Sequence, residues 1–141
     1  MEKTKIIGSA TAKNSGDIYK TDIVTGAFSF IVDEPVEYGG QNAGPAPADY
    51  LCMALASCKA ITVRMYVQRK GWNVSHIDVS VNLVKGSQAS AAMNTFLCTV
   101  LLQGELNDEQ RKRILDIAKI CPIERLLGKM NDVVTVLEYK N

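Results

Sequence analysis

Four cysteines are the residues of this 141-residue chain with the clearest capacity for chemistry: Cys52, Cys58, Cys98 and Cys121. The nucleophilic form of cysteine is the thiolate, so the surroundings of each sulfur decide what it can do. The four show no CxxC spacing and do not cluster with the single histidine, His76. We therefore expect no metal site, and thiol redox chemistry is the chemistry to consider.

Cys121 stands at an expected helix start, followed by Pro122. Proline suits the first helical position, because the N–H that it lacks would have no partner there. A sulfur at the preceding cap position faces unpaired N–H groups and the positive end of the helix dipole, and both lower the pKa of a thiol. Arg125 follows one turn later. The pattern predicts a thiol that ionises readily.

Cys58 lies in the middle of a long apolar segment, and Lys59 follows it directly. Two interpretations are open. Cys58 is either a small buried hydrophobic residue or a nucleophile in an apolar pocket between packed helices. Because burial raises the pKa of a thiol, the second interpretation requires a nearby cation.

Cys52 and Cys98 are expected to pack in the core. Cys52 precedes Cys58 by six residues on one expected helix, which separates them by about 9 Å along the axis and about 240° around it. The two cannot form a disulfide unless the helix unwinds. Cys98 alternates with Phe96 and Val100 in an expected strand, a pattern typical of core packing.

The helix that carries Cys58 is predicted to run from Pro47 to Lys70, about 36 Å, and to end at Gly71. One face has apolar or small residues at the spacing of three and four: Leu51, Ala54, Leu55, Cys58, Ile61, Thr62 and Met65. Further apolar residues lie off this stripe. A helix that is apolar on most of its circumference is buried on most of it. We expect this face to be covered, and the chain to form a homodimer because one small sheet would not cover the whole helix.

The remaining elements predict an α+β fold in one domain, residues 1–141. An antiparallel meander of strands is expected at 5–12, 17–24 and 27–32, followed by a loop at 33–47. After the long helix we expect a hairpin of strands at 76–83 and 96–102, joined by a linker at 85–94. Two helices, from Asn107 and from Cys121 to Gly128, and a last strand at 132–139 complete the chain. Asn107 and Gln110 form a capping-box pattern.

Composition excludes several classes of function. The 16 basic and 15 acidic residues are balanced and no basic tract stands out, so nucleic-acid binding is not expected. The N-terminus has no apolar run of signal-peptide length, and the most apolar stretch, Tyr50 to Ala56, is too short to span a bilayer. We expect a soluble cytoplasmic protein, in which a structural disulfide framework is not expected.

Three segments together resemble the OsmC/Ohr family. Residues 33–47 contain Asp-Glu-Pro, Gly-Gly and Gly-Pro-Ala-Pro, residues 55–58 read Leu-Ala-Ser-Cys, and residues 120–122 read Ile-Cys-Pro. The resemblance covers most of the chain and agrees with the expected order of elements. It implies an intertwined homodimer in which mixed β-sheets, with strands from both chains, wrap around two long central helices.

The resemblance also implies thiol peroxidase chemistry on organic hydroperoxides, without a cofactor. Cys58 would attack the peroxide O–O bond as a thiolate, and Cys121 would capture the resulting sulfenic acid as a disulfide. A dithiol reductant, of the lipoyl type in the hydroperoxide-resistance branch, would then restore both thiols. Apolar residues near Cys58 would favour a hydrophobic peroxide.

Two departures from the family pattern leave an alternative open. The family's catalytic arginine comes from the N-terminal strands, but this chain has none before Arg64, and Lys20, or less plausibly Lys13, would have to supply the charge. Ala48 stands where the family has a catalytic glutamate. Asp49 follows, about 13 Å along the helix from Cys58 and on the opposite side, so it would have to act on a partner chain. The alternative is a non-catalytic dimeric redox-sensing or ligand-binding protein on the same scaffold.

Overall fold

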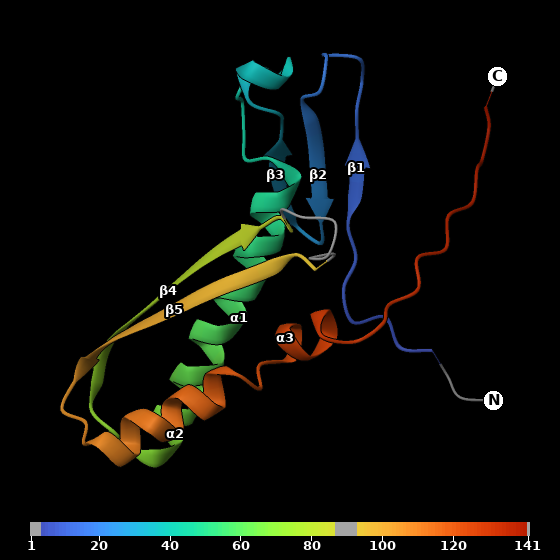
Figure 1. The fold of residues 1–141 in the computed structure, drawn as a ribbon. Coiled ribbons are helices and arrows are strands. Elements are labelled where there is room, and N and C mark those ends of the chain that lie inside the picture. The colour runs from blue at the N-terminus through green and yellow to red at the C-terminus, as the bar shows by residue number, and fades with distance from the viewer. Residues whose placement is uncertain (1–3, 87–92, 141) are drawn as a thin grey trace. The chain divides into compact units, whose positions relative to one another are not determined.

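The computed structural model describes residues 4–86 and 93–140. Contacts divide the chain into two compact units, Met1–Leu51 and Cys52–Asn141. Both contain strands, and the second contains most of the helical residues (Figure 1). Each unit is described by itself.

The first unit contains an antiparallel sheet in the order β1 (Thr11–Lys13), β2 (Thr21–Thr25), β3 (Phe28–Val32). The predicted meander is confirmed, although β1 and β2 are shorter than expected. The late start of β2 follows from Asn14, whose side-chain amide donates hydrogen bonds to the Ile18 carbonyl at 3.2 Å and the Thr21 hydroxyl at 3.1 Å. These bonds hold the connection as a turn and delay the start of β2.

The loop after β3 is organised by the buried carboxylate of Asp33, which accepts backbone hydrogen bonds from Glu34, Gln41 and Ala43 at 2.7, 3.2 and 3.1 Å. Burial alone would raise the pKa of Asp33, but these bonds and the charge of Lys20 outweigh it and lower the pKa. The short 3-10 helix η1 (Val36–Tyr38) lies within this loop. Local hydrogen bonds therefore order the predicted loop at 33–47.

Helix α1 (Pro47–Lys70) has the predicted bounds, and Gly71 ends it with a left-handed φ of 69°. Its first turn is held to β3 within the first unit, since the Tyr50 hydroxyl donates to the Ile31 carbonyl at 2.7 Å. By length and composition, α1 is the one helix of the described residues that could cross a membrane. The core helix of a soluble protein passes the same test, so this is weak evidence for a span.

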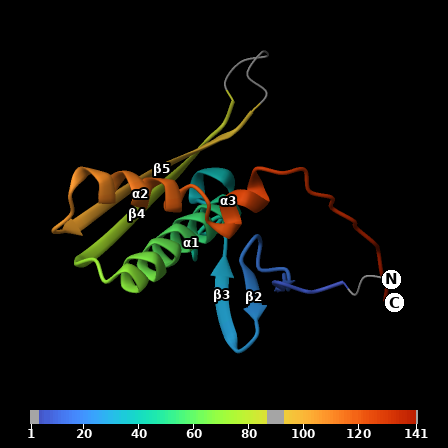
Figure 2. The same cartoon turned by 90° about the horizontal axis from the view of Figure 1, so that it is seen from below.

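The second unit adds the hairpin β4 (Val74–Val84) and β5 (Thr95–Gly104), and the helices α2 (Asp108–Ala118) and α3 (Pro122–Leu127) (Figure 2). The predicted hairpin is confirmed, but part of its linker falls on residues 87–92, outside the described residues. The predicted capping box is also confirmed: the Asn107 side chain accepts from the Gln110 amide at 2.8 Å, and the Gln110 side chain accepts from the Asn107 amide at 2.9 Å.

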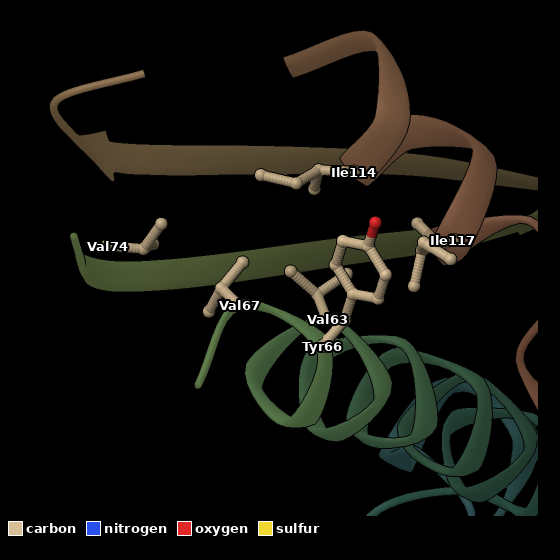
Figure 3. Packing of buried hydrophobic residues seen from close by; sticks show 7 residues of the cluster. Val63, Tyr66, Val67, Val74, Ile114 and Ile117 are labelled. Carbon is tan, nitrogen blue, oxygen red and sulfur yellow. The ribbon is translucent and has the colours of Figure 1, made fainter. Parts of the chain in front are cut away.

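The core of the second unit is a cluster where α1, β4 and α2 meet, and Figure 3 shows its side chains pointing toward one another. It consists of Val63, Tyr66, Val67, Val74, Ile114, Ile117 and Ala118. Each fully buried aliphatic side chain in such a cluster stabilises the fold by about 1.5–3 kcal/mol. The cluster fixes the face that α1 presents to the rest of its unit.

That face differs from the predicted one. The buried residues of α1 are Leu55, Lys59, Val63, Tyr66 and Val67. In the predicted stripe, Leu51, Ile61 and Met65 are 49%, 54% and 67% exposed. Because α1 is apolar on nearly all sides, periodicity did not single out the face that the hairpin and α2 cover. We call Leu51, Ile61 and Met65 the exposed stripe.

The predicted strand at 132–139 is wrong for the described chain, because residues 129–140 form no helix or strand. Its apolar side chains, from Val133 to Tyr139, are each at least 80% exposed. A strand needs a neighbouring edge to satisfy its backbone groups, and this segment pairs with none in the described residues. β-branched residues favour a strand, but this pattern does not indicate which edge the segment would pair with.

Candidate functional site

Cys58 and Cys121 are brought together in the second unit. Cys58 lies midway along α1 and is half-buried, whereas Cys121 precedes α3 and is fully buried. A hydrogen bond with the Cys58 side chain is one of the causes acting on the pKa of Cys121. The Cys58 side chain on α1 is therefore close enough to the Cys121 sulfur to affect its pKa, and both residues are free thiols.

Cys121 occupies the predicted cap position. Its backbone is extended, with φ −63° and ψ 146°, Pro122 begins the helix, and the Cys121 sulfur accepts a hydrogen bond from the Glu124 amide at 3.4 Å. The local geometry thus follows from the Cys-Pro pair, since a cysteine cap and a proline at the first helical position satisfy the helix start together.

The pKa of Cys121 is nevertheless raised, contrary to the expectation from its place at a helix start. Burial is the largest cause, and the hydrogen bond and charge of Cys58 add to it. The Glu124 amide and the charge of Lys59 act in the opposite direction but do not outweigh burial. The sequence indicated the helix start but not the depth at which the sulfur lies.

Lys59 is the residue of this site that the sequence reasoning missed. Only 3% of it is exposed, and its ammonium group donates to the Ala118 carbonyl at 2.8 Å and lies 3.3 Å from Glu124 Oε1. Ala118 ends α2, so the ammonium also meets the negative end of that helix. Two signals were available: a lysine beside Cys58 in an apolar helix, and a glutamate three residues after Cys121.

Cys98 lies on β5 and is exposed, so its expected place in the core is wrong. Its pKa is raised, first by local burial of the sulfur and then by the charges of Glu124 and Cys52, while Lys59 lowers it. Cys98 therefore lies within electrostatic reach of the Lys59–Glu124 pair and of the half-buried Cys52. The core-packing expectation for Cys52 holds only in part, because that residue is half-buried.

Lys20 and Asp49, the stand-ins considered for the missing arginine and glutamate, have local partners in the first unit. The charge of Lys20 lowers the pKa of Asp33. The Asp49 carboxylate accepts a hydrogen bond from the Ala46 amide at 3.0 Å, across the start of α1. These contacts explain both residues as parts of the local structure, and any action on Cys58 stays a prediction.

An apolar groove lies beyond Cys58 along α1. Its volume is about 420 Å³, and its lining residues are Ala60, Ile61, Arg64, Met65 and Ile77. Arg64 is held at its edge by hydrogen bonds from the guanidinium to the carbonyls of Val74 at 2.6 Å and Ser75 at 3.2 Å. A groove of this kind suits the hydrocarbon part of a ligand. Within residues 4–86 and 93–140, no three His, Cys, Asp or Glu side chains are grouped so as to hold a metal ion.

The sequence matches a family model described as OsmC-like protein over residues 39–136. No curated protein sequence matches it. Among solved structures, an OsmC-like protein from Mycoplasma pneumoniae is similar with a TM-score of 0.71 and 17% identity, covering 91% of this chain and 89% of that one.

Two further structures share the fold. A Psychrobacter arcticus protein named for osmotic stress induction and detoxification has a TM-score of 0.71 and 20% identity, covering 87% of this chain and 90% of that one. An organic hydroperoxide resistance protein from Elizabethkingia anophelis has a TM-score of 0.61 and 18% identity, covering 89% and 90%. The likeness confirms the predicted α+β fold, with helices and small antiparallel sheets.

Proposed function

Since the chain belongs to the OsmC-like protein family, we propose that it is a cysteine-based thiol peroxidase that reduces organic hydroperoxides through Cys58 and Cys121. One observation carries the proposal: the half-buried Cys58 thiol on α1 lies close enough to the buried Cys121 thiol at the start of α3 to raise its pKa. Similar structures that are named organic hydroperoxide resistance proteins support the choice of substrate.

The reaction consists of two steps at the cysteine pair. The Cys58 thiolate attacks one peroxide oxygen, so that an S–O bond forms, the O–O bond breaks, and the alkoxide takes up a proton and leaves as the alcohol. Cys58 is thereby oxidised by two electrons to a sulfenic acid. The Cys121 sulfur then attacks the Cys58 sulfur, a disulfide forms, and the sulfenic hydroxyl leaves as water with the Cys121 proton. A dithiol, for which a lipoyl-type compound is our candidate, returns both cysteines to thiols.

The groove that Ile61 and Met65 line, further along α1 than Cys58, supports a hydrophobic substrate. Ile61 lies one helical turn from Cys58 and contributes to its wall together with Met65. A hydrocarbon chain gains about 0.8 kcal/mol for each methylene that it buries, a gain that hydrogen peroxide cannot make. We therefore expect a peroxide with a hydrocarbon substituent to react faster than hydrogen peroxide.

We propose that the working form is a homodimer in the cytoplasm. Two features lack a covering partner in the described residues: the exposed stripe of α1 and the apolar segment at 133–139. A second copy would cover both by an isologous contact, in which each chain contributes the same surface. This arrangement would bury the face that was expected to be covered, and the groove that Ile61 and Met65 line would then lie at the contact between the two chains.

A second candidate function is supported by the raised pKa of Cys121. A thiol that keeps its proton at neutral pH closes a disulfide slowly, and slow closure suits a redox-sensing or ligand-binding protein better than an efficient peroxidase. The two candidates share the fold and the cysteine pair, and they differ in the rate of oxidation.

One assay separates the candidates. Fully reduced protein is mixed with cumene hydroperoxide or with hydrogen peroxide, and the loss of free thiols is followed in time. Rapid loss of two thiols per chain, faster with cumene hydroperoxide, supports the peroxidase. Loss as slow as that of free cysteine supports the alternative. Peptide mapping then identifies the oxidised pair: Cys58 with Cys121 is expected, and a disulfide of Cys52 or Cys98 would contradict the assignment.

A further inference from the structure

The buried ammonium of Lys59 joins three helices at the point where Cys121 lies. It belongs to α1, it donates to the last residue of α2 at Ala118, and it pairs with Glu124 in the first turn of α3. Glu124 in turn donates its backbone N–H to the Cys121 sulfur. A continuous path of contacts thus leads from the residue next to Cys58 to the opposing sulfur.

We propose that Lys59 is the positioning residue for the resolving thiol, Cys121. Held by Glu124 and the Ala118 carbonyl, its ammonium keeps a positive charge near the Cys121 sulfur. This inference rests on the proposed function and assigns the second step of the reaction to a charge that the family's arginine does not supply here.

A purely structural role does not explain this arrangement well. Burying an ammonium group costs several kcal/mol in lost hydration, and apolar side chains often replace buried ion pairs without loss of stability. The position faces the same side of α1 as Leu55 and Val63, where an apolar side chain would pack. Glu124 also keeps a second oxygen, Oε2, that is buried without a hydrogen-bond partner in the described residues. The Glu124 carboxylate can therefore accept a further hydrogen bond, which joining the helices does not require.

The charged groups around Cys121 determine whether its pKa should rise or fall when Lys59 is replaced. Cys58 and Lys59 face it from α1, Glu124 faces it from α3, and Cys98 on β5 lies near the same ion pair. Of these, the Lys59 charge lowers the pKa of Cys121. Removing it should raise that pKa further, leave less thiolate at neutral pH, and move the second step to higher pH.

The test compares Lys59→Met with Lys59→Arg in single-turnover reactions with cumene hydroperoxide. Formation of the Cys58 sulfenic acid is followed by trapping with dimedone, and disulfide formation by peptide mapping at timed quench points. We expect the methionine variant to form the sulfenic acid within about threefold of the wild-type rate, and to form the disulfide about tenfold more slowly, as a pKa shift of about one unit implies. The arginine variant should retain most of the second rate.

The pH profile excludes a merely structural effect. In Lys59→Met the rate of disulfide formation should reach its half-maximum at higher pH than in the wild type, and high pH should restore it. A misplaced Cys121 would lower the rate at every pH, and that result, or an unchanged second step, would overturn the proposal. If Lys59→Met does not fold, Glu124→Gln, which removes the negative charge that offsets Lys59 but keeps a hydrogen-bond acceptor, should move the half-maximum of the second step to lower pH. An unchanged second step in that variant would also overturn the proposal.

A separate measurement distinguishes failure of this inference from failure of the proposed function. In a chain whose only cysteine is Cys121, made by Cys→Ser changes at 52, 58 and 98, the ultraviolet absorbance of the thiolate is titrated with and without Lys59→Met. A higher titration midpoint in the methionine variant supports the role of Lys59 even if the wild-type protein does not consume peroxide. An unchanged midpoint would overturn that role even if the protein is an active peroxidase.

Discussion

The two faces of α1 depart from the usual rule that charged residues are exposed and apolar residues are buried. The face that packs in the second unit carries Lys59 among Leu55, Val63 and Tyr66, whereas the exposed stripe is entirely apolar. Cys58 lies at the border between the two and is half-buried. A charge is buried where it has partners from other helices, and apolar residues are exposed where no segment of the described chain covers them. The buried face holds the ion pair near the cysteines, whereas the exposed stripe, proposed for assembly, also contributes Ile61 and Met65 to the groove.

The largest effect on the peroxide reaction is expected from replacing Cys58, which lies at the border between the two faces. Cys58→Ser should abolish the peroxide reaction, because serine lacks a nucleophile that peroxide can oxidise. Cys121→Ser should permit one oxidation and then accumulate a sulfenic acid on Cys58, detectable with dimedone. The matched controls are Cys52→Ser and Cys98→Ser, which should keep both steps. Peroxide consumption by Cys58→Ser through Cys121 would mean that the roles are reversed.

The exposed stripe is tested by placing a charge on it. Ile61→Lys should shift the sedimentation of the protein at micromolar concentration from dimer to monomer, because an unpaired ammonium group in an apolar interface is not compensated. Leu115→Lys on α2 is the matched control: Leu115 is 50% exposed, close to the 54% of Ile61, and this change should leave the dimer intact. A wild-type monomer of about 15 kDa would refute the assembly outright.

The buried face is tested by removing volume. Val63 is completely buried in the core cluster, and Val63→Ala should lower the free energy of unfolding by about 1.5–3 kcal/mol through lost burial and a residual cavity. Because this loss arises within one chain, the difference between variant and wild type in denaturant unfolding should not depend on protein concentration. If it does, Val63 contributes to the association of chains as well.

The smallest effect is expected when both members of the ion pair are replaced. The double variant Lys59→Met with Glu124→Leu should have a free energy of unfolding within about 1 kcal/mol of the wild type. The variant loses the attraction between the two charges, but folding no longer has to remove water from a buried ammonium group. The Glu124 side chain is 40% exposed, so water can reach it when Lys59 alone is removed. A loss as large as that of Val63→Ala in the double variant would indicate that the pair exists for stability.

Much of the molecule was predictable from local patterns. The bounds of α1, the hairpin of β4 and β5, the capping box at Asn107 and the cap at Cys121 each depend on neighbouring residues, so their signals lie in short stretches of sequence. The family motifs around Cys58 and Cys121 indicated the candidate pair for the same reason. The family pattern itself contains two cysteines that are far apart in sequence, so this pair could be proposed without knowing the fold.

Tertiary structure alone decided what depends on distant contacts. The packing of the hairpin and α2 decides which face of α1 is buried. Because α1 is apolar on nearly all sides, the spacing of its apolar residues does not indicate that face. The depth of Cys121 raises its pKa against the effect of the helix start, and no local pattern encodes depth. Lys59 contacts Ala118 and Glu124 some sixty residues further along the chain. The sequence therefore determined that a cation follows Cys58, and only folding decided that it pairs with Glu124, whose amide donates to the opposing cysteine.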